Sequence, residues 1–291
     1  MIGRFLVGEA ADRRILFRSG AIIVSEDVKR RPILQLIGAS KRFGAVEALR
    51  SVDFEVFAGE VVALVGDNGA GKSTLVKILS GTYRADAGKY VFEGVEVKIT
   101  NPRHATELGI QTVYQDLALC ENLDVVSNLY LGREQRRGLL PQPIDVLDEI
   151  KMERAAVEFI NELHVNIPSL RSRMAGLSGG QRQSVAVARA VMWNSKVVIL
   201  DEPTAALGIE QTQQVKQLIL RLSRRGLGVV VVSHNLADIF DVSDRIVVLR
   251  LGARVATFDT SAVTPEVVVG SITGVSFGRP AGSERPVTRT A

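Results

Sequence analysis

A glycine-rich loop between two apolar segments constrains this chain more than any other feature. Residues 66–74 read Gly-Asp-Asn-Gly-Ala-Gly-Lys-Ser-Thr, which fits the pattern G-x-x-x-x-G-K-[ST]. The apolar run at residues 61–65 predicts a buried strand before the loop, and residues 75–79 predict the start of a helix after it. Small residues let backbone N–H groups surround a phosphate there, and a helix N-terminus adds partial positive charge. The pattern therefore predicts a site for nucleotide phosphates.

Every residue of the loop is a candidate for binding those phosphates: Gly66, Asp67, Asn68, Gly69, Ala70, Gly71, Lys72, Ser73 and Thr74. We expect the Lys72 ammonium to reach the β- and γ-phosphates of ATP, and the Ser73 hydroxyl to hold Mg²⁺.

Two later motifs narrow the class of protein. Residues 177–181 read Leu-Ser-Gly-Gly-Gln, and residues 197–202 read Val-Val-Ile-Leu-Asp-Glu. In this order, after the glycine-rich loop, they resemble the signature motif and the Walker B strand of the ATP-binding subunits of ABC transporters. The resemblance covers residues 33–274. It implies an α/β fold, with a P-loop NTPase core of mainly parallel sheet, an antiparallel β layer and a helical subdomain at about residues 117–190.

Composition limits the other possibilities. No apolar run approaches the roughly 20 residues of a membrane-spanning helix, and the single cysteine, Cys120, excludes an internal disulfide. The net charge is +4, but residues 1–32 hold seven Lys or Arg against four Asp or Glu, and residues 276–291 hold three against one. The basic excess therefore lies in the two ends of the chain, which argues against nucleic acid as a partner.

The chain divides into three parts by pattern. Residues 1–32 carry scattered arginines and no long apolar stretch, and we expect a disordered or poorly ordered extension. Residues 33–274 form the predicted ATP-binding domain, with strands at 52–56, 89–92, 95–99, 110–114 and 229–232 and a helix at 152–163. Residues 275–291 contain Pro, Gly and Arg and predict a flexible tail.

The resemblance assigns a role to five further residues. It implies that Phe43 stacks on adenine and that Gln115 ligates Mg²⁺ or its water. Asp201 ends the Walker B strand and would hold Mg²⁺. Glu202 would orient or deprotonate the attacking water, and His234 would link that water to the γ-phosphate. Taken alone, Phe43 is also compatible with a core position and Gln115 with a surface position.

The signature motif predicts a second phosphate site. Ser178, Gly179, Gly180 and Gln181 present a hydroxyl and backbone N–H groups at a helix start, and in the family this surface closes on nucleotide held by another domain. One chain carries one copy of each half-site, so we expect a head-to-tail homodimer that ATP binding closes and hydrolysis reopens. Gly208 stands where the family generally has an aspartate, which leaves the usual contact across the dimer in doubt.

The class of ABC protein follows from what the chain lacks. Soluble translation-type proteins join two ATP-binding domains, whereas this chain has one. Chromosome- and repair-type proteins insert long coiled coils between the glycine-rich loop and the signature motif, and the interval here is too short for that. Exporters are often fused to membrane helices, which this sequence does not show. An importer ATPase fits better. Residues 115–119, 122–125, 128–134 and 203–208 resemble the ATPases of monosaccharide importers. The resemblance implies membrane permease partners, an indirect solute-binding protein, and a peripheral position at the cytoplasmic face of the inner membrane. Import of another small solute and a soluble non-transport ATPase remain the alternatives.

Overall fold

The computed structural model describes residues 15–18, 21–24, 31–137 and 146–275. The chain divides into two units, Met1–Arg31 and Pro32–Ala291. In the first unit, β1 (Ile15–Arg18) pairs antiparallel with β2 (Ala21–Val24). The other residues of the predicted extension up to residue 30, and the predicted tail beyond Val275, lie outside the described residues.

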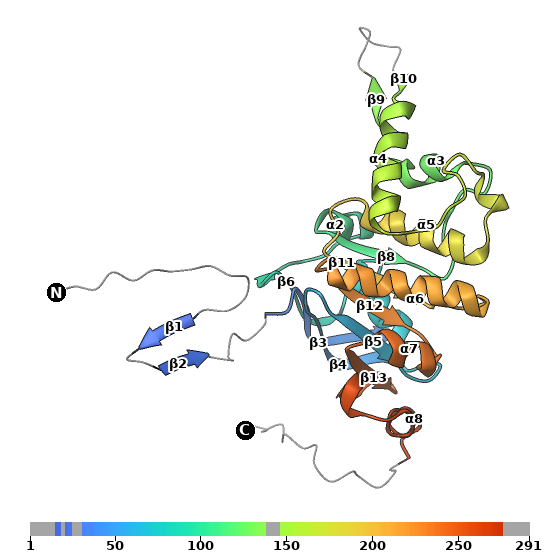
Figure 1. Cartoon of the computed structure of the whole chain (residues 1–291). Coiled ribbons are helices and arrows are strands. Elements are labelled where there is room, and N and C mark those ends of the chain that lie inside the picture. The colour runs from blue at the N-terminus through green and yellow to red at the C-terminus, as the bar shows by residue number, and fades with distance from the viewer. Residues whose placement is uncertain (1–14, 19–20, 25–30, 138–145, 276–291) are drawn as a thin grey trace. The chain divides into compact units, whose positions relative to one another are not determined.

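A six-stranded sheet forms the centre of the second unit, in the order β14-β13-β5-β12-β11-β8. Its strands are β5 (Val61–Val65), β8 (Ile110–Val113), β11 (Val197–Asp201), β12 (Gly228–Val232), β13 (Arg245–Arg250) and β14 (Ala253–Asp259). Neighbouring strands run parallel except β14, which pairs antiparallel with β13. The mainly parallel sheet predicted from the sequence is confirmed (Figure 1).

A second, antiparallel sheet has the order β4-β3-β6-β7. Its strands are β3 (Leu34–Phe43), β4 (Val46–Val56), β6 (Ala87–Phe92) and β7 (Val95–Glu96). The strand predicted at residues 52–56 begins earlier, at Val46, and the strand predicted at residues 95–99 ends at Glu96. The register of the β3–β4 pair shifts at three places. Such irregularities interrupt the alternation of apolar and polar residues that would mark one long strand in the sequence.

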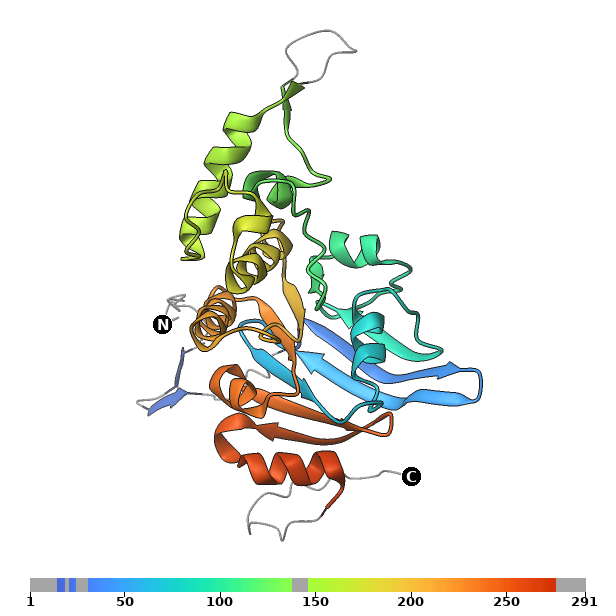
Figure 2. The ribbon, with the colours of Figure 1, turned by 90° about the vertical axis from the view of Figure 1, so that its right-hand side faces the viewer.

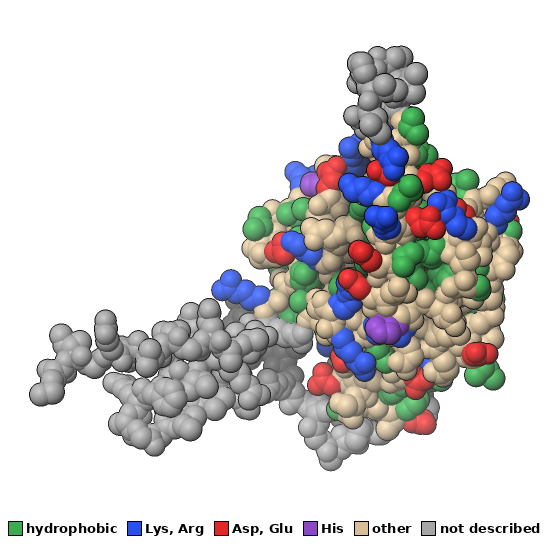
Figure 3. Space-filling model, turned by 45° about the horizontal axis from the view of Figure 1, so that its top comes forward, with side chains coloured by type: hydrophobic (Ala, Val, Ile, Leu, Met, Phe, Trp, Pro, Cys, Tyr) green, Lys and Arg blue, Asp and Glu red, His purple; other side chains and the backbone are tan. Residues whose placement is uncertain are grey.

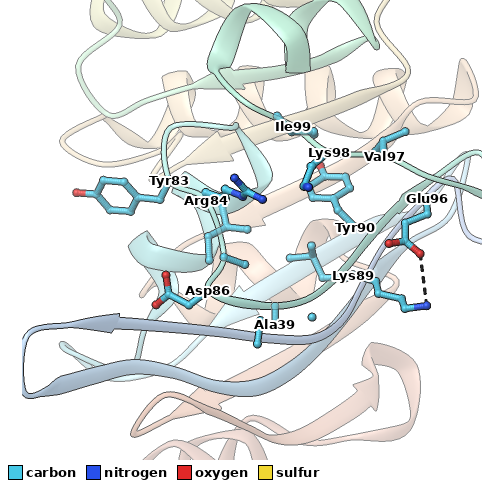
Figure 4. A pocket seen from close by; sticks show the side chains of 15 residues that line it. Ala39, Tyr83, Arg84, Asp86, Lys89, Tyr90, Glu96, Val97, Lys98 and Ile99 are labelled. Atoms are coloured by element: carbon cyan, nitrogen blue, oxygen red, sulfur yellow. Dashed lines mark ion pairs between the residues drawn. The ribbon is translucent and has the colours of Figure 1, made fainter.

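A cavity of about 400 Å³ opens beside this sheet and contains none of the predicted phosphate-binding residues. Figure 4 shows Lys89 and Glu96 paired at its edge, with 3.4 Å between Nζ and Oε2. Tyr90 lies along its wall and donates a hydrogen bond to the Leu79 carbonyl at 3.0 Å. Burial raises the pKa of the Tyr90 phenol, so Tyr90 remains a neutral donor.

Helices cover the sheets. They are α1 (Lys72–Leu79), α2 (Pro102–Glu107), α3 (Val125–Tyr130), α4 (Glu149–Glu162), α5 (Gly179–Val191), α6 (Ile209–Arg224), α7 (Leu236–Val242) and α8 (Pro265–Thr273). Figures 1 and 2 show α3, α4 and α5 gathered together, and α5 contacts α3, α6 and β8. A short ladder pairs β9 (Arg136–Arg137) with β10 (Val146–Leu147) before α4. Within residues 31–137 and 146–275, no helix has the length and apolar composition needed to cross a membrane.

The central strands are buried on both faces, which explains their continuous apolar sequences. Val61, Ala63 and Val65 of β5 belong to a core shared with α3 to α8. Val62 and Leu64 belong to a second core, shared with the antiparallel sheet and α1. Because alternate residues of a strand point to opposite faces, one apolar strand anchors both layers.

Asn128 fixes the segment between β8 and α3. Its side chain is fully buried, and its Oδ1 accepts a hydrogen bond from the Cys120 N–H at 2.8 Å. Its Nδ2 donates to the carbonyl oxygens of Cys120 at 3.0 Å and Asp124 at 2.9 Å. We expect Asn128→Ala to lower the free energy of unfolding by about 2 kcal/mol, since it removes three hydrogen bonds from part-buried backbone groups. Urea denaturation measures this.

The control is Asn122→Ala, because Asn122 is exposed on the same segment. Equal free energies of unfolding for the two variants would contradict the role of Asn128.

Candidate functional site

The carboxyl ends of four neighbouring parallel strands meet at one edge of the central sheet. The register pairs Leu64 with Val232, Val232 with Asp201, and Leu200 with Val113. The glycine-rich loop follows β5, His234 follows β12, Glu202 follows β11 and Gln115 follows β8. The edge of an open parallel sheet where its strands end is the usual place for a ligand. The strand order therefore brings these predicted groups together.

The glycine-rich loop has a backbone that other residues would not adopt easily. Gly66 and Gly71 have φ angles of 154° and 105°. A Cβ at Gly66 would overlap the Leu249 carbonyl oxygen, and one at Gly71 would lie 2.7 Å from the Ala48 carbonyl oxygen. Residues 68–74 line a cavity of about 430 Å³ at this loop, together with Leu251 and others.

Lys72 begins α1 and its ammonium points back into the loop. Nζ donates to the carbonyl oxygens of Gly66 at 2.7 Å and Asp67 at 3.0 Å. Ser73 is exposed in the first turn of the helix. The first turn contains no acidic residue, so the partial positive charge of the helix N-terminus is not neutralised by its own side chains.

Two adjacent acids differ in their surroundings. Asp201, the last residue of β11, has a raised pKa, chiefly because of burial and then because of Glu202, while Lys72 and Lys77 oppose the shift. Glu202 leaves the strand with a φ of 50°, in the left-handed region that is costly for a side-chain-bearing residue. Its Oε1 lies 3.0 Å from Nδ1 of His234, whose side chain is 77% exposed. The contact leaves most of the imidazole accessible to a substrate.

Gln115 and Phe43 lie further out. Gln115 is exposed two residues after β8 ends, beside Tyr114, whose hydroxyl lies 3.1 Å from Ser80 Oγ. Phe43 ends β3 and is 44% exposed. Its ring meets Tyr83 edge to face, with 5.3 Å between centroids. Phe43 is thus a surface aromatic and not a core residue, although it does not line the loop cavity.

The signature residues contact a different element. Ser178 caps α5: its Oγ accepts from the Gln181 N–H at 3.3 Å, and Gln181 Oε1 accepts from the Ser178 N–H at 3.0 Å. A Cβ at Gly180 would lie 2.8 Å from Cβ of Gln211, and one at Gly179 would lie 3.0 Å from Leu207. These glycines therefore allow α5 to approach α6 closely. The two glycines thus lie against α6 and its preceding loop, while Ser178 and Gln181 bond to each other at the start of α5.

Two polar groups at this edge escape the sequence analysis. Thr204 donates through Oγ1 to Oδ2 of Asp238 at 2.8 Å, which links the loop of Glu202 to α7. Thr204 follows Glu202 and Pro203 directly, and that adjacency is the signal that could have found it. Asp238 offers no such signal, because most aspartates lie exposed on the protein surface.

Known proteins resemble this chain over most of its length. The family described as ABC transporter matches residues 49–205. The fructose import ATP-binding protein FrcA of Rhizobium meliloti is 44% identical over 84% of this chain and 95% of its own length. The xylose/arabinose import ATP-binding protein XylG of Sulfolobus acidocaldarius is 41% identical over 85% and 96%. The ribose import ATP-binding protein RbsA 1 of Rubrobacter xylanophilus is 42% identical over 82% of this chain, but only 46% of that protein is covered.

Solved structures show the same fold. An ATP-binding cassette of an ABC transporter in its ADP conformation has a TM-score of 0.69 at 25% identity, covering 84% of this chain and 95% of its own. A dimeric cassette in a post-hydrolysis state, bound to ADP and phosphate, has a TM-score of 0.64 at 25% identity, covering 78% and 98%. The chain therefore belongs to the ABC transporter family, as one of its ATP-binding proteins, which hydrolyse ATP.

Proposed function

We propose that this ATPase powers an importer for a monosaccharide. The observation that carries the proposal is the contact between Glu202 and His234, with 3.0 Å between Oε1 and Nδ1. The contact lies at the sheet edge where the glycine-rich loop follows β5. That arrangement supplies the parts needed for hydrolysis. The fructose and xylose/arabinose import proteins, matched over 95% and 96% of their lengths, support the kind of cargo.

The chemistry we assign to the site is positioning and charge neutralisation. The loop N–H groups and Lys72 hold the phosphates of ATP, and Phe43 covers the adenine. Glu202 orients and deprotonates the attacking water. His234 holds that water against the γ-phosphate and keeps the Glu202 carboxylate in place.

The oxygen donors at the edge fit Mg²⁺. Magnesium prefers oxygen ligands and is bound by one or two protein groups with phosphates and waters. The Ser73 hydroxyl, the Asp201 carboxylate and the Gln115 amide oxygen are such groups. When bound, the ion would neutralise part of the charge on the phosphates. The Asp201 carboxylate would hold the ion. Without the ion, partial burial disfavours the ionised carboxylate and raises its pKa.

Asp201 tests this assignment through stability. Its folded pKa is raised, so at pH 7 the ionised carboxylate destabilises the folded state, and this penalty disappears as the pH falls below the unfolded pKa. We therefore expect Asp201→Asn to raise the melting temperature of the nucleotide-free protein at pH 7 and to abolish ATP hydrolysis dependent on Mg²⁺. Calorimetry at pH 7 and at about pH 4 measures the first effect, which should shrink at the lower pH. An unchanged hydrolysis rate would contradict the metal role.

A second copy of the chain is the partner we assign to the signature residues. Ser178, Gly179, Gly180 and Gln181 lie at the start of α5, where the two glycines pack against α6 and its preceding loop. We assign to them the nucleotide of a facing subunit. The dimeric structure of a related cassette supports this arrangement. Gly208 caps α6 with a φ of −70°, and a Cβ there would meet no atom within 4 Å. An aspartate would fit, so packing within the subunit does not explain the glycine.

Glu202→Gln tests the dimer and the base together. The substitution keeps the shape of the side chain but removes its basicity, so ATP should accumulate unhydrolysed and hold the dimer closed. We expect the variant to elute as a dimer with Mg-ATP in size-exclusion chromatography and to lose at least about 100-fold in kcat. Wild type, which hydrolyses ATP, should dimerise only transiently. A variant that stays monomeric at high concentration would refute the composite site.

A groove beside α5 is the surface we assign to the permease. It is a cavity of about 260 Å³ lined by residues that include Asp116, Leu117, Leu131 and Trp193. Arg189 of α5 donates to the carbonyl oxygens of Leu117 and Ala118 at 3.1 and 2.9 Å and so fixes one wall. Residues 116–118, which line the groove, directly follow Gln115 in sequence. A movement of Gln115 on loss of the γ-phosphate would therefore change the shape of the groove.

Docking at this groove implies a peripheral subunit at the cytoplasmic face of the inner membrane, with a solute-binding protein as an indirect partner. Nucleic acid is not among the partners we propose. On the face that Figure 3 shows, basic and acidic side chains are interspersed. Among the described residues, arginines pair with acids, as in Arg171–Glu153 at 2.7 Å and Arg225–Glu162 at 2.9 Å.

Crosslinking tests the permease surface. Asn122 is exposed beside the groove segment, whereas Asn128 is buried and unsuitable for a reporter. In a Cys120→Ser background, because Cys120 is an exposed native thiol, we expect Asn122→Cys to crosslink to the co-expressed permease. Gln217→Cys, on the exposed face of α6, should not. Labelling confined to the α6 position would place the permease elsewhere.

A further inference from the structure

Asp238, in the first turn of α7, is a meeting point of three elements. The residue is 8% exposed. Its Oδ2 accepts from Thr204 Oγ1 at 2.8 Å and from Asn235 Nδ2 at 2.9 Å. Its Oδ1 accepts from Lys216 Nζ at 3.2 Å. The three donors come from the loop after β11, the loop after β12 and helix α6.

Each of the two loops carries one member of the proposed hydrolytic pair. Thr204 is two residues after Glu202, and Asn235 is next to His234. Because Thr204 and Asn235 donate to the same oxygen atom, the carboxylate sets how far apart the two loops stand. Removing the Thr204 bond would leave the two loops joined by the bond from the Glu202 N–H to the Val232 carbonyl oxygen and by the Glu202–His234 contact.

The loop of Glu202 needs such support. Glu202 and Ala206 have φ angles of 50° and 60°, and they flank Thr204. Side-chain-bearing residues persist in this region only where the surroundings hold them. The Glu202 N–H donates to the Val232 carbonyl oxygen at 2.9 Å, which continues the sheet ladder. The bond from Thr204 to Asp238 is the side-chain contact that holds the turn further on.

Lys216 balances the charge of this junction. Its side chain is 7% exposed and also contacts Asp241 Oδ2 at 2.6 Å. Burial acts to lower the pKa of Lys216, but the bonds to Asp241 and Asp238 outweigh it and raise the pKa. The lysine therefore remains charged beside the Asp238 carboxylate, with Nζ 3.2 Å from Oδ1. A buried ion pair is weak grounds for stability by itself, so a purely structural role must be tested against a functional one.

We propose that Asp238 is a positioning residue for ATP hydrolysis, whose carboxylate holds the Glu202 and His234 loops at the separation where the two side chains meet. The inference rests on the roles proposed for Glu202 and His234. It adds Thr204 and Asn235, whose side chains donate to the carboxylate, and Lys216, which supplies the opposite charge.

Thr204 offers the cleanest test, because Val keeps its shape without the hydroxyl and Ser keeps the hydroxyl. We expect Thr204→Val to lower kcat by about tenfold or more, the equivalent of one hydrogen bond to a charged group. KM and the dissociation constant for Mg-ATP should stay within about twofold. Thr204→Ser should recover most of kcat. Asp238→Asn, which replaces one acceptor oxygen by a donor, should show the same loss of kcat without loss of binding.

Asp241→Asn is the matched control, since it removes the other carboxylate on Lys216 but tethers neither loop; its kcat should match wild type. All rates are measured well below each melting temperature, so a purely structural role would lower the melting temperature and leave kcat unchanged. An active wild type whose kcat survives both Thr204→Val and Asp238→Asn overturns this inference alone. A wild type that binds ATP without hydrolysing it, or a Glu202→Gln variant as active as wild type, overturns the proposed function and this inference with it.

Discussion

The backbone ladder that joins β5, β12, β11 and β8 in parallel is the constraint on which the rest depends. It aligns the ends of the four strands, so the loops that follow them must leave the sheet at one edge. The glycine loop, Gln115, Glu202 and His234 are far apart in sequence and come from four different strand ends. Their proximity is created by strand order, and a site assembled this way is as rigid as the sheet that carries it.

The same strands explain why the sheet is rigid. Each of β5, β11 and β12 contributes alternate side chains to two separate cores, one with the helices and one with the antiparallel sheet and α1. A strand buried on both faces cannot slip by one residue without exchanging its two sets of partners. The register that aligns the loops is therefore fixed by packing on both sides, at a distance from the chemistry.

The sequence predicted the parts of this arrangement that are encoded locally. The glycine loop, the Walker B run and the apolar strand before His234 each carry their own signal within about ten residues, the length that periodicity arguments need. Contacts between segments far apart in the chain leave no such local signal in the sequence. The bond between Glu202 and His234 and the tethering of Thr204 by Asp238 depend on strand order, which one sequence does not reveal. Asn128 belongs to the residues that resemble monosaccharide-importer ATPases, but its side chain is fully buried within the fold. Its amide is satisfied by backbone groups that only the folded loop brings together.

Helix α6 connects the two halves of the proposed mechanism. Near its start, Gln211 lies against Gly180, so the signature end of α5 rests on it without room for a side chain. Farther along, Lys216 of the same helix reaches the Asp238 carboxylate that holds the Glu202 and His234 loops. In the proposed dimer, a shift of the signature residues would act through α6 on the loops that carry Glu202 and His234. The two half-sites of a dimer would then be joined within each subunit as well as across the interface.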